Sequence, residues 1–175
     1  MSDTNIYSTG VFPDVQKQVR DRLASFADFN GVALIMQYEG GIESRISEAL
    51  SVMTEGCRPG IAVLIATPYL DESPRSRNSP GLLIDPLAVS LAVVEDTIFN
   101  QAETGSGRRC IEWAILCVQA LKGWTPTGCS KPLTGLGKTI TLAPSQGSRV
   151  QNNVSLQTSV GLPLLRHQGE YGFIS

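Results

Sequence analysis

Three consecutive residues, Gly137, Lys138 and Thr139, form the motif of this sequence that most resembles a chemical site. Glycine, lysine and threonine in this order hold nucleotide phosphates when another glycine lies five residues earlier and a helix follows. The residue five positions before Gly137 is Pro132, which has no N–H to donate. The following "TITLAP" alternates polar and apolar residues and predicts a short strand. A lysine at the mouth of a turn is favoured, and a small nucleotide-binding enzyme using Gly135 to Thr139 is the alternative.

The histidine and the acidic residues form no catalytic pattern. His167 is the single histidine and lies near the C-terminus in "LLRHQGEYGFIS", where chain ends are usually mobile. No G-x-S-x-G turn accompanies it, and one histidine cannot form a histidine cluster for a metal. Asp85, Glu95 and Asp96 flank a predicted strand, a position where carboxylates are usually solvated. We therefore expect no catalytic residue, no metal site and no cofactor.

The four cysteines, Cys57, Cys110, Cys117 and Cys129, lack C-x-x-C spacing. Cys110 and Cys117 are two turns apart on a predicted helix, about 10 Å, which is too far for a disulfide. Buried thiols are the favoured interpretation. A zinc site is the second one.

Length and charge limit the class of protein. The 175 residues suit one domain, and 14 basic against 16 acidic residues give a net charge of −2. This balance argues against nucleic acid as the main partner and against sequence-specific nucleic-acid binding. The N-terminus lacks a signal-peptide pattern, and no run of eighteen apolar residues occurs. We expect a soluble protein made in the cytoplasm, with no membrane partner.

Hydrophobic periodicity predicts alternating helices and strands in the first part of the chain. After a flexible arm at 1–12, a helix from about Pro13 to Ala27 is expected, then a strand at 31–38 and a helix at 41–56. The inward stripe of the first helix is Val15, Val19, Leu23 and Phe26. The apolar strand at 59–70 is expected inside a sheet, followed by a projecting polar loop at 71–81.

The second part predicts more strands than helices. A long strand at 85–96 should turn Leu87, Val89, Leu91 and Val93 inward, and strands are also expected at 138–144 and 149–160. A helix at 107–122 should bury a stripe of Ile111, Ile115, Val118 and Leu121. This order predicts one α+β domain over 13–165, with a mixed, mostly antiparallel sheet packed against two to three helices and a tail at 166–175.

Four residues are candidates for contact with a partner: Arg108, Arg109, Trp124 and Lys138. The two arginines begin a helix, against the preference of the helix dipole, which hints at a partner surface, although solvation is the simpler interpretation. Of the large aromatic residues, Tyr38, Phe99 and Trp113 are expected in or near the core. We favour Trp124 as a lid on that core over a contact with another chain.

The chain resembles the tail-terminator or tail-completion proteins of long-tailed bacteriophages and related prophages. The resemblance covers about residues 13–160 and lies in the order of elements: the helix "VQKQVRDRLASF", the strand "PGIAVLIAT", the strand and loop "AVSLAVVEDTIFNQAETGSG", and a helix ending in "ALKGWTP". Gly123, Trp124 and Pro126 are its most specific part.

This resemblance implies a virion protein that is not an enzyme. Such subunits form a ring, a hexamer in this family, on the last ring of the tail tube, stop tube growth and join the tail to the head connector. The expected partners are further copies of the chain, the tail tube protein, the head-tail connector or stopper and the tail sheath. A half-polar last strand could then face the lumen of the ring or pair with a neighbour's edge. The alternative within the same machinery is a head-tail connector or stopper.

Overall fold

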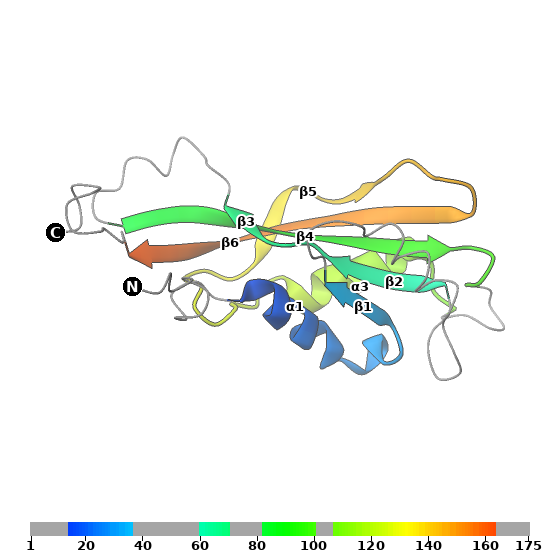
Figure 1. The fold of residues 1–175 in the computed structure, drawn as a ribbon, viewed down its shortest axis with the longest axis horizontal. Coiled ribbons are helices and arrows are strands. Elements are labelled where there is room, and N and C mark those ends of the chain that lie inside the picture. Colours follow the sequence, from blue (N-terminus) through cyan, green and yellow to red (C-terminus); the bar gives the residue numbers. More distant parts are fainter. Residues whose placement is uncertain (1–13, 37–59, 71–81, 101–106, 164–175) are drawn as a thin grey trace, which may run out of the picture.

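The computed structural model of the protein describes residues 14–36, 60–70, 82–100 and 107–163. In this part of the chain a mixed sheet carries two α-helices on one of its faces (Figure 1). The predicted α+β class and mostly antiparallel sheet are confirmed. The arm at 1–12, the helix at 41–56, the loop at 71–81 and the tail at 166–175 lie outside the described residues, as do Tyr38, Cys57 and His167.

Two long strands form the middle of the sheet. The strands are β1 (Ala33–Met36), β2 (Ile61–Ile65), β3 (Tyr69–Leu70), β4 (Leu82–Asp96), β5 (Thr134–Leu142) and β6 (Arg149–Pro163). Their order is β1-β2-β4-β6-β5, and β3 pairs with β4. β1 and β2 are parallel, and every other pair is antiparallel. β4 and β6 pair along their whole length, from Leu82 with Pro163 to Asp96 with Arg149.

Helix α1 (Val15–Ala24) begins where predicted and ends earlier. The Asp14 carboxylate accepts the N–H of Lys17 at 3.0 Å and so caps the helix. After Ala24 the chain tightens into the 3₁₀ turn η1 (Ala27–Phe29). Phe26 therefore packs against the core from outside the helix rather than from its stripe.

The main core lies between the sheet and the helices α1 and α3 (Cys110–Leu121). α1 contributes Val15, Val19 and Leu23, as predicted. Trp113 of α3 is fully buried, and its ring meets the edge of Phe29 with centroids 5.6 Å apart. β4 contributes alternate residues, Leu87, Val89, Leu91 and Val93, again as predicted.

β2 is buried on both faces. Ile61, Val63 and Ile65 face the main core, whereas Ala62 and Leu64 form a second small cluster with Val94. This explains why its sequence is continuously apolar rather than alternating. The expected interior position of this strand is confirmed, because it lies between β1 and β4.

The predicted buried stripe of α3 is wrong for two of its four residues. Ile111 and Ile115 are 45% and 43% exposed, whereas Leu121 is buried and Val118 is half-buried against the core. The buried face consists of Cys110, Trp113, Ala114, Cys117, Ala120 and Leu121. Glu112 and Gln119, the two polar residues among the twelve of this helix, are seven residues apart and so lie on one exposed side, and the buried face is the opposite one.

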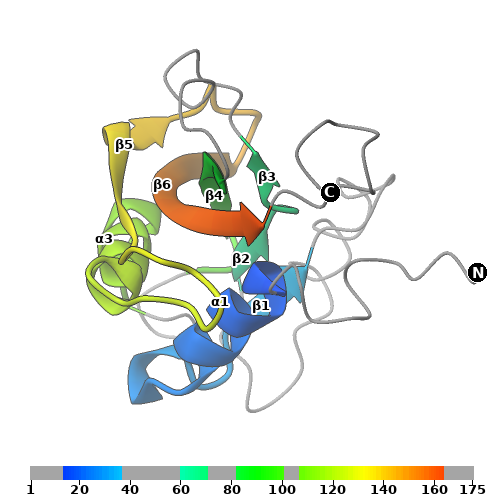
Figure 2. The same cartoon turned by 90° about the vertical axis from the view of Figure 1, so that its left-hand side faces the viewer.

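The last strand is flanked on both sides over most of its length. β6 lies between β4 and β5 as far as Gln157, and its polar residues Asn152 and Thr158 are buried, so the half-polar face does not line an open surface. The edge strand is β5, which begins at Thr134 rather than at Lys138. Its pairing with β6 is interrupted by a register shift between Gly135 and Ile140. Figure 2 shows β5 beside the curved β6 and above α3.

Candidate interface site

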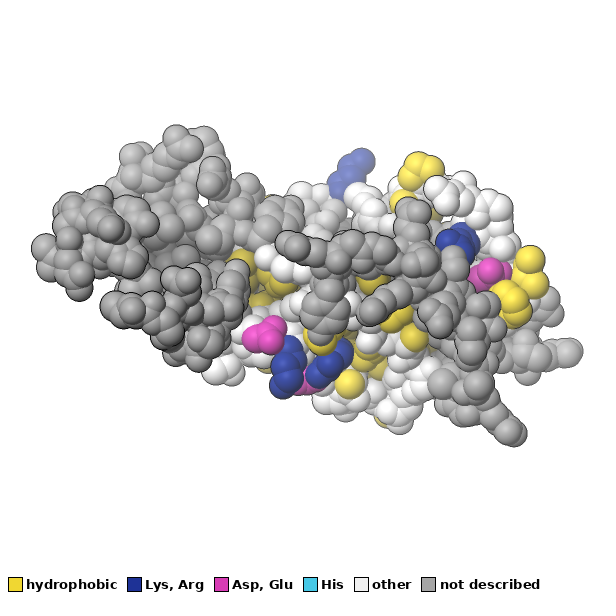
Figure 3. All heavy atoms as spheres, in the orientation of Figure 1, with side chains coloured by type: hydrophobic (Ala, Val, Ile, Leu, Met, Phe, Trp, Pro, Cys, Tyr) yellow, Lys and Arg dark blue, Asp and Glu magenta, His cyan; other side chains and the backbone are white. Residues whose placement is uncertain are grey.

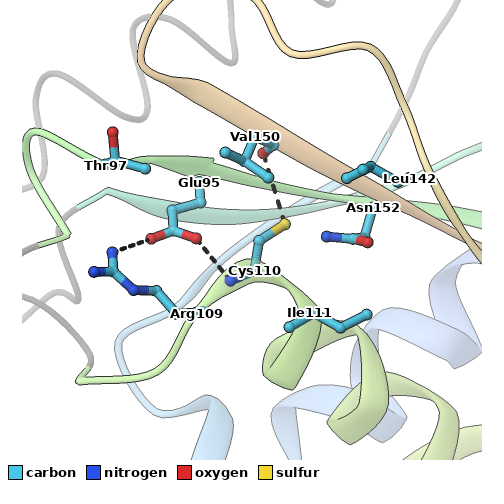
Figure 4. A pocket seen from close by; sticks show the side chains of 8 residues that line it. All are labelled: Glu95, Thr97, Arg109, Cys110, Ile111, Leu142, Val150 and Asn152. Atoms are coloured by element: carbon cyan, nitrogen blue, oxygen red, sulfur yellow. Dashed lines mark hydrogen bonds and ion pairs between the residues drawn. The ribbon is translucent and has the colours of Figure 1, made fainter.

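A hollow of about 610 Å³ opens where β4 ends, β6 begins and α3 starts. It lies on the helix-covered face of the sheet, next to the first turn of α3. Figure 4 shows its walls. The lining residues are Glu95, Thr97, Arg109, Cys110, Ile111, Leu142, Val150 and Asn152.

Glu95 is the buried acid of this site, with 2% of its surface exposed. Its odd number continues the inward alternation of Leu87 to Val93, so the strand directs its carboxylate under α3. Oε1 accepts hydrogen bonds from Asn100 Nδ2 at 2.9 Å and from Arg109 Nη1 at 3.0 Å. Oε2 accepts the backbone N–H of Cys110 at 2.7 Å. The expectation that Glu95 is an ordinary solvated carboxylate is wrong.

Two carboxylates close the N-terminus of α3. Its N-cap residue is Arg109, whose side chain has no hydrogen-bond acceptor. The carboxylate of Glu95 takes the N–H of Cys110 instead, and Glu112 Oε2 accepts the N–H of Arg109 at 2.7 Å. Negative charge at this end complements the helix dipole, which offsets the two arginines that precede the helix.

Cys110 and Asn152 form the floor of the hollow. The Cys110 thiol donates to the carbonyl of Val93 at 3.1 Å. Burial raises the pKa of the Cys110 thiol, and hydrogen bonds from Asn152 only partly oppose that shift. The thiol is therefore protonated at neutral pH and is no nucleophile. Burial likewise raises the pKa of Cys117 to about 12 and raises that of Cys129. Cys110 and Cys117 are buried free thiols, as predicted, and Cys129 is a half-buried one.

The rim of the hollow is apolar and exposed. Figure 4 shows Ile111 and Leu142 on opposite sides, with Asn152 between them. The exposed large hydrophobic side chains of the described chain are Ile98, Phe99, Ile111, Ile115 and Leu142. Ile111 and Leu142 line the hollow, and Ile115 lies one helical turn after Ile111. Ile98 and Phe99 directly follow Thr97, which also lines it. Phe99, which was expected near the core, is 43% exposed.

The surface view agrees with this placement. In Figure 3, hydrophobic side chains reach the surface at the end of the molecule where β4 ends and β6 begins, beside charged ones. Exposed apolar side chains that gather at one end of a protein are typical of a protein contact.

The four predicted contact residues do not form one cluster. Arg108 pairs with Asp28 at 2.7 Å and stacks over Trp113, and Arg109 reaches into the hollow to Glu95. Trp124 packs against the main core, as the lid interpretation predicted, and the guanidinium of Arg22 lies over its ring. Lys138 is exposed on the edge strand β5. Of the four, Arg109 alone lines the hollow.

The Gly-Lys-Thr motif lies inside a strand. Gly135, Gly137, Lys138 and Thr139 all belong to β5, and the chain continues through a turn into β6 rather than into a helix. The pairing is irregular between Gly135 and Ile140, but no helix follows the motif, so the helix N-terminus that would hold a phosphate is missing here. This placement agrees with the rejection of a P-loop on the sequence.

Several residues of the site were missed by the sequence reasoning. Glu95 could have been found, because it is the next alternate residue after Leu87, Val89, Leu91 and Val93 and so points to the same face of β4. Leu142 and Ile111 could not, since both belong to apolar patterns that equally suit a core position. Asn152 lies on the same face of its strand as the apolar residues Val154 and Leu156, a position that gives no sign of a hollow.

No protein-family model and no curated protein matches this chain. Among the described residues no helix is long and apolar enough to cross a membrane. Across the same ranges, no three His, Cys, Asp or Glu side chains gather as metal ligands would.

Proposed function

We propose that this protein is a structural subunit of a phage-type tail. In this proposal copies of the chain form a ring on the end of the tail tube, stop its growth and join the tail to the head connector. The observation that carries an assembly role is the apolar rim of the hollow. Leu142 is 70% exposed and Ile98 is 61% exposed, and both lie at one end of the molecule. Burying such side chains against a partner contributes about 25 cal/mol per Å².

The free edge of β5 supports the same role. β5 pairs with β6 on one side, and no described strand pairs with its other edge. Unpaired N–H and C=O groups of an edge strand can accept a strand from another chain. Lys138 is exposed on this strand and would give the contact a positive charge. The hollow and the edge meet at Leu142, so one partner could cover both.

The kind of assembly rests on the resemblance over residues 13–160. The α+β architecture is compatible with it. A head-tail connector or stopper would use the same exposed features, because it also closes into a ring. Location in the virion, and contacts with tube, sheath and connector proteins, belong to this proposal.

The test is polymerisation of the tail tube protein with and without this chain. We expect electron microscopy to show shorter tubes, each with a ring at one end, as the ratio of this chain increases. Leu142→Asp should abolish the effect, because it places a charge in the contact without disturbing the core. Lys131→Asp, an exposed position before β5, is the matched control. Unchanged tubes would refute the proposal, and rings that bind only the head connector would favour the connector role.

A further inference from the structure

Residues on the outward face of α3 are spaced as in a contact between two helices. Ile111, Ile115, Val118 and Lys122 follow one another at intervals of four, three and four residues. This is the spacing of a coiled-coil seam. Ile111 and Ile115 are exposed and Val118 is half-buried, so the seam lies on the side of the helix that does not face the sheet.

The apolar surface of α3 is wider than the part that the sheet covers. Its polar residues Glu112 and Gln119 lie on one side of the helix, and Ile111 and Ile115, between that side and the buried face, remain exposed. The sheet covers one side of α3 with its Trp113 and Cys117 face. Figure 2 shows α3 at the boundary of the molecule, below β5.

The charges at the two ends of the seam are self-complementary. Glu112 is exposed in the first turn of α3, and Lys122 is exposed directly after its last turn. The two residues are about 15 Å apart along the helix, too far to pair within one chain. In an antiparallel pair of α3 helices, each Glu112 approaches the Lys122 of the other copy. The opposed helix dipoles favour the same orientation.

We infer that two copies of this chain associate in solution through antiparallel α3 helices. The contact is isologous, with the twofold axis between Ile115 and Val118, so that Ile115 of each copy packs against Val118 of the other and Glu112 lies near Lys122. A helix of twelve residues is about 18 Å long, so the contact is smaller than a standard interface and should be weak. The inference concerns the free chain and does not depend on the proposed function.

The test is sedimentation equilibrium of the purified full chain from about 1 to 500 μM, the range in which a contact of this size should dissociate. We expect a monomer-dimer equilibrium in the micromolar range. Ile115→Glu should remove the dimer, and because this side chain is 43% exposed the variant should still fold.

Charge-reversal variants test whether Glu112 of one copy pairs with Lys122 of the other. Glu112→Lys and Lys122→Glu should each weaken association about tenfold, because each places like charges together twice per dimer. Glu112→Lys also removes the acceptor of the Arg109 N–H, so urea unfolding of each variant is measured first. The double variant lacks the same acceptor and should nevertheless regain most of the wild-type affinity, which a loss of the cap alone would not produce. Lys131→Glu is the control, with the same change of charge at an exposed position away from α3.

Two results would overturn the inference. One is a wild-type chain that stays monomeric over the whole range, which would show that this face does not pair with itself. The other is association that the single reversals leave unchanged or that the double variant fails to restore. Either result leaves the tube-capping experiment unaffected, since that one depends on Leu142 and β5.

Discussion

The carboxylate of Glu95 accepts the backbone N–H of Cys110 at 2.7 Å and so joins the end of β4 to the start of α3. The same carboxylate binds Arg109 and Asn100. One side chain therefore fixes the N-terminus of the helix, the turn after β4 and a wall of the hollow.

Glu95→Gln should destabilise the fold strongly. The amide that replaces one oxygen brings N–H donors toward groups that are themselves donors, and a charged hydrogen bond is lost in a buried place. We expect a loss of about 2 to 4 kcal/mol in the free energy of unfolding, measured with urea. Asp28→Asn breaks an exposed pair with Arg108 and should cost less than about 1 kcal/mol. Equal losses of unfolding free energy in Glu95→Gln and Asp28→Asn would contradict the structural importance of Glu95.

Gly60→Ala should be far more costly than Gly123→Ala. Both glycines have positive φ, +78° and +84°. A Cβ at Gly60 would lie 2.5 Å from the backbone N of Asn100, whereas one at Gly123 would meet nothing within 4 Å. We expect Gly60→Ala to lower the free energy of unfolding by more than about 3 kcal/mol. Gly123→Ala should lower it by about 1 kcal/mol, because only the unfavourable backbone conformation contributes there. Thermal unfolding of the two variants would measure this difference, and similar melting temperatures would contradict it.

Cys117 should make stability fall at alkaline pH. Its folded pKa is about 12, raised from 9.0 by burial. The unfolded chain releases the proton near pH 9, whereas the folded chain keeps it, so the stabilisation present below pH 9 is lost as pH rises toward 12. The slope from one such thiol is about 1.4 kcal/mol per pH unit.

Comparison with Cys117→Ala isolates this slope. The variant should be less stable at pH 7, because a cavity replaces the sulfur, but its stability should fall less steeply between pH 9 and 11. Urea unfolding at several pH values measures both effects. Parallel curves for the two proteins would mean that the thiol is not protected from ionisation.

ATP and GTP should leave the melting temperature unchanged. A ligand that binds the folded state raises it in a concentration-dependent way. Lys138 lies on an edge strand without a phosphate-binding loop, so Lys138→Ala should behave like the wild type in this measurement. A shift that Lys138→Ala removes would support the nucleotide-binding alternative instead.

The periodicity of single strands and of α1 could be read from the sequence. Residues Leu87 to Val93 alternate, and only one face of β4 meets the main core. Val15, Val19 and Leu23 lie on one side of a helix whose other side is charged, which leaves a single way to bury it. The continuous apolar run of β2 likewise required cover on both faces.

Within the described residues the sequence by itself determined which segments form helices and strands, though not where each begins and ends, because each local pattern favours one period of apolar side chains. Only the tertiary structure decided how much of the apolar surface of α3 is covered, since the sheet leaves Ile111 and Ile115 exposed. It also decided that β6 lies inside the sheet and β5 at its edge, because strand order depends on contacts between distant segments. Glu95 became a structural centre for the same reason: its partners Asn100, Arg109 and Cys110 reach it only when β4 and α3 pack together.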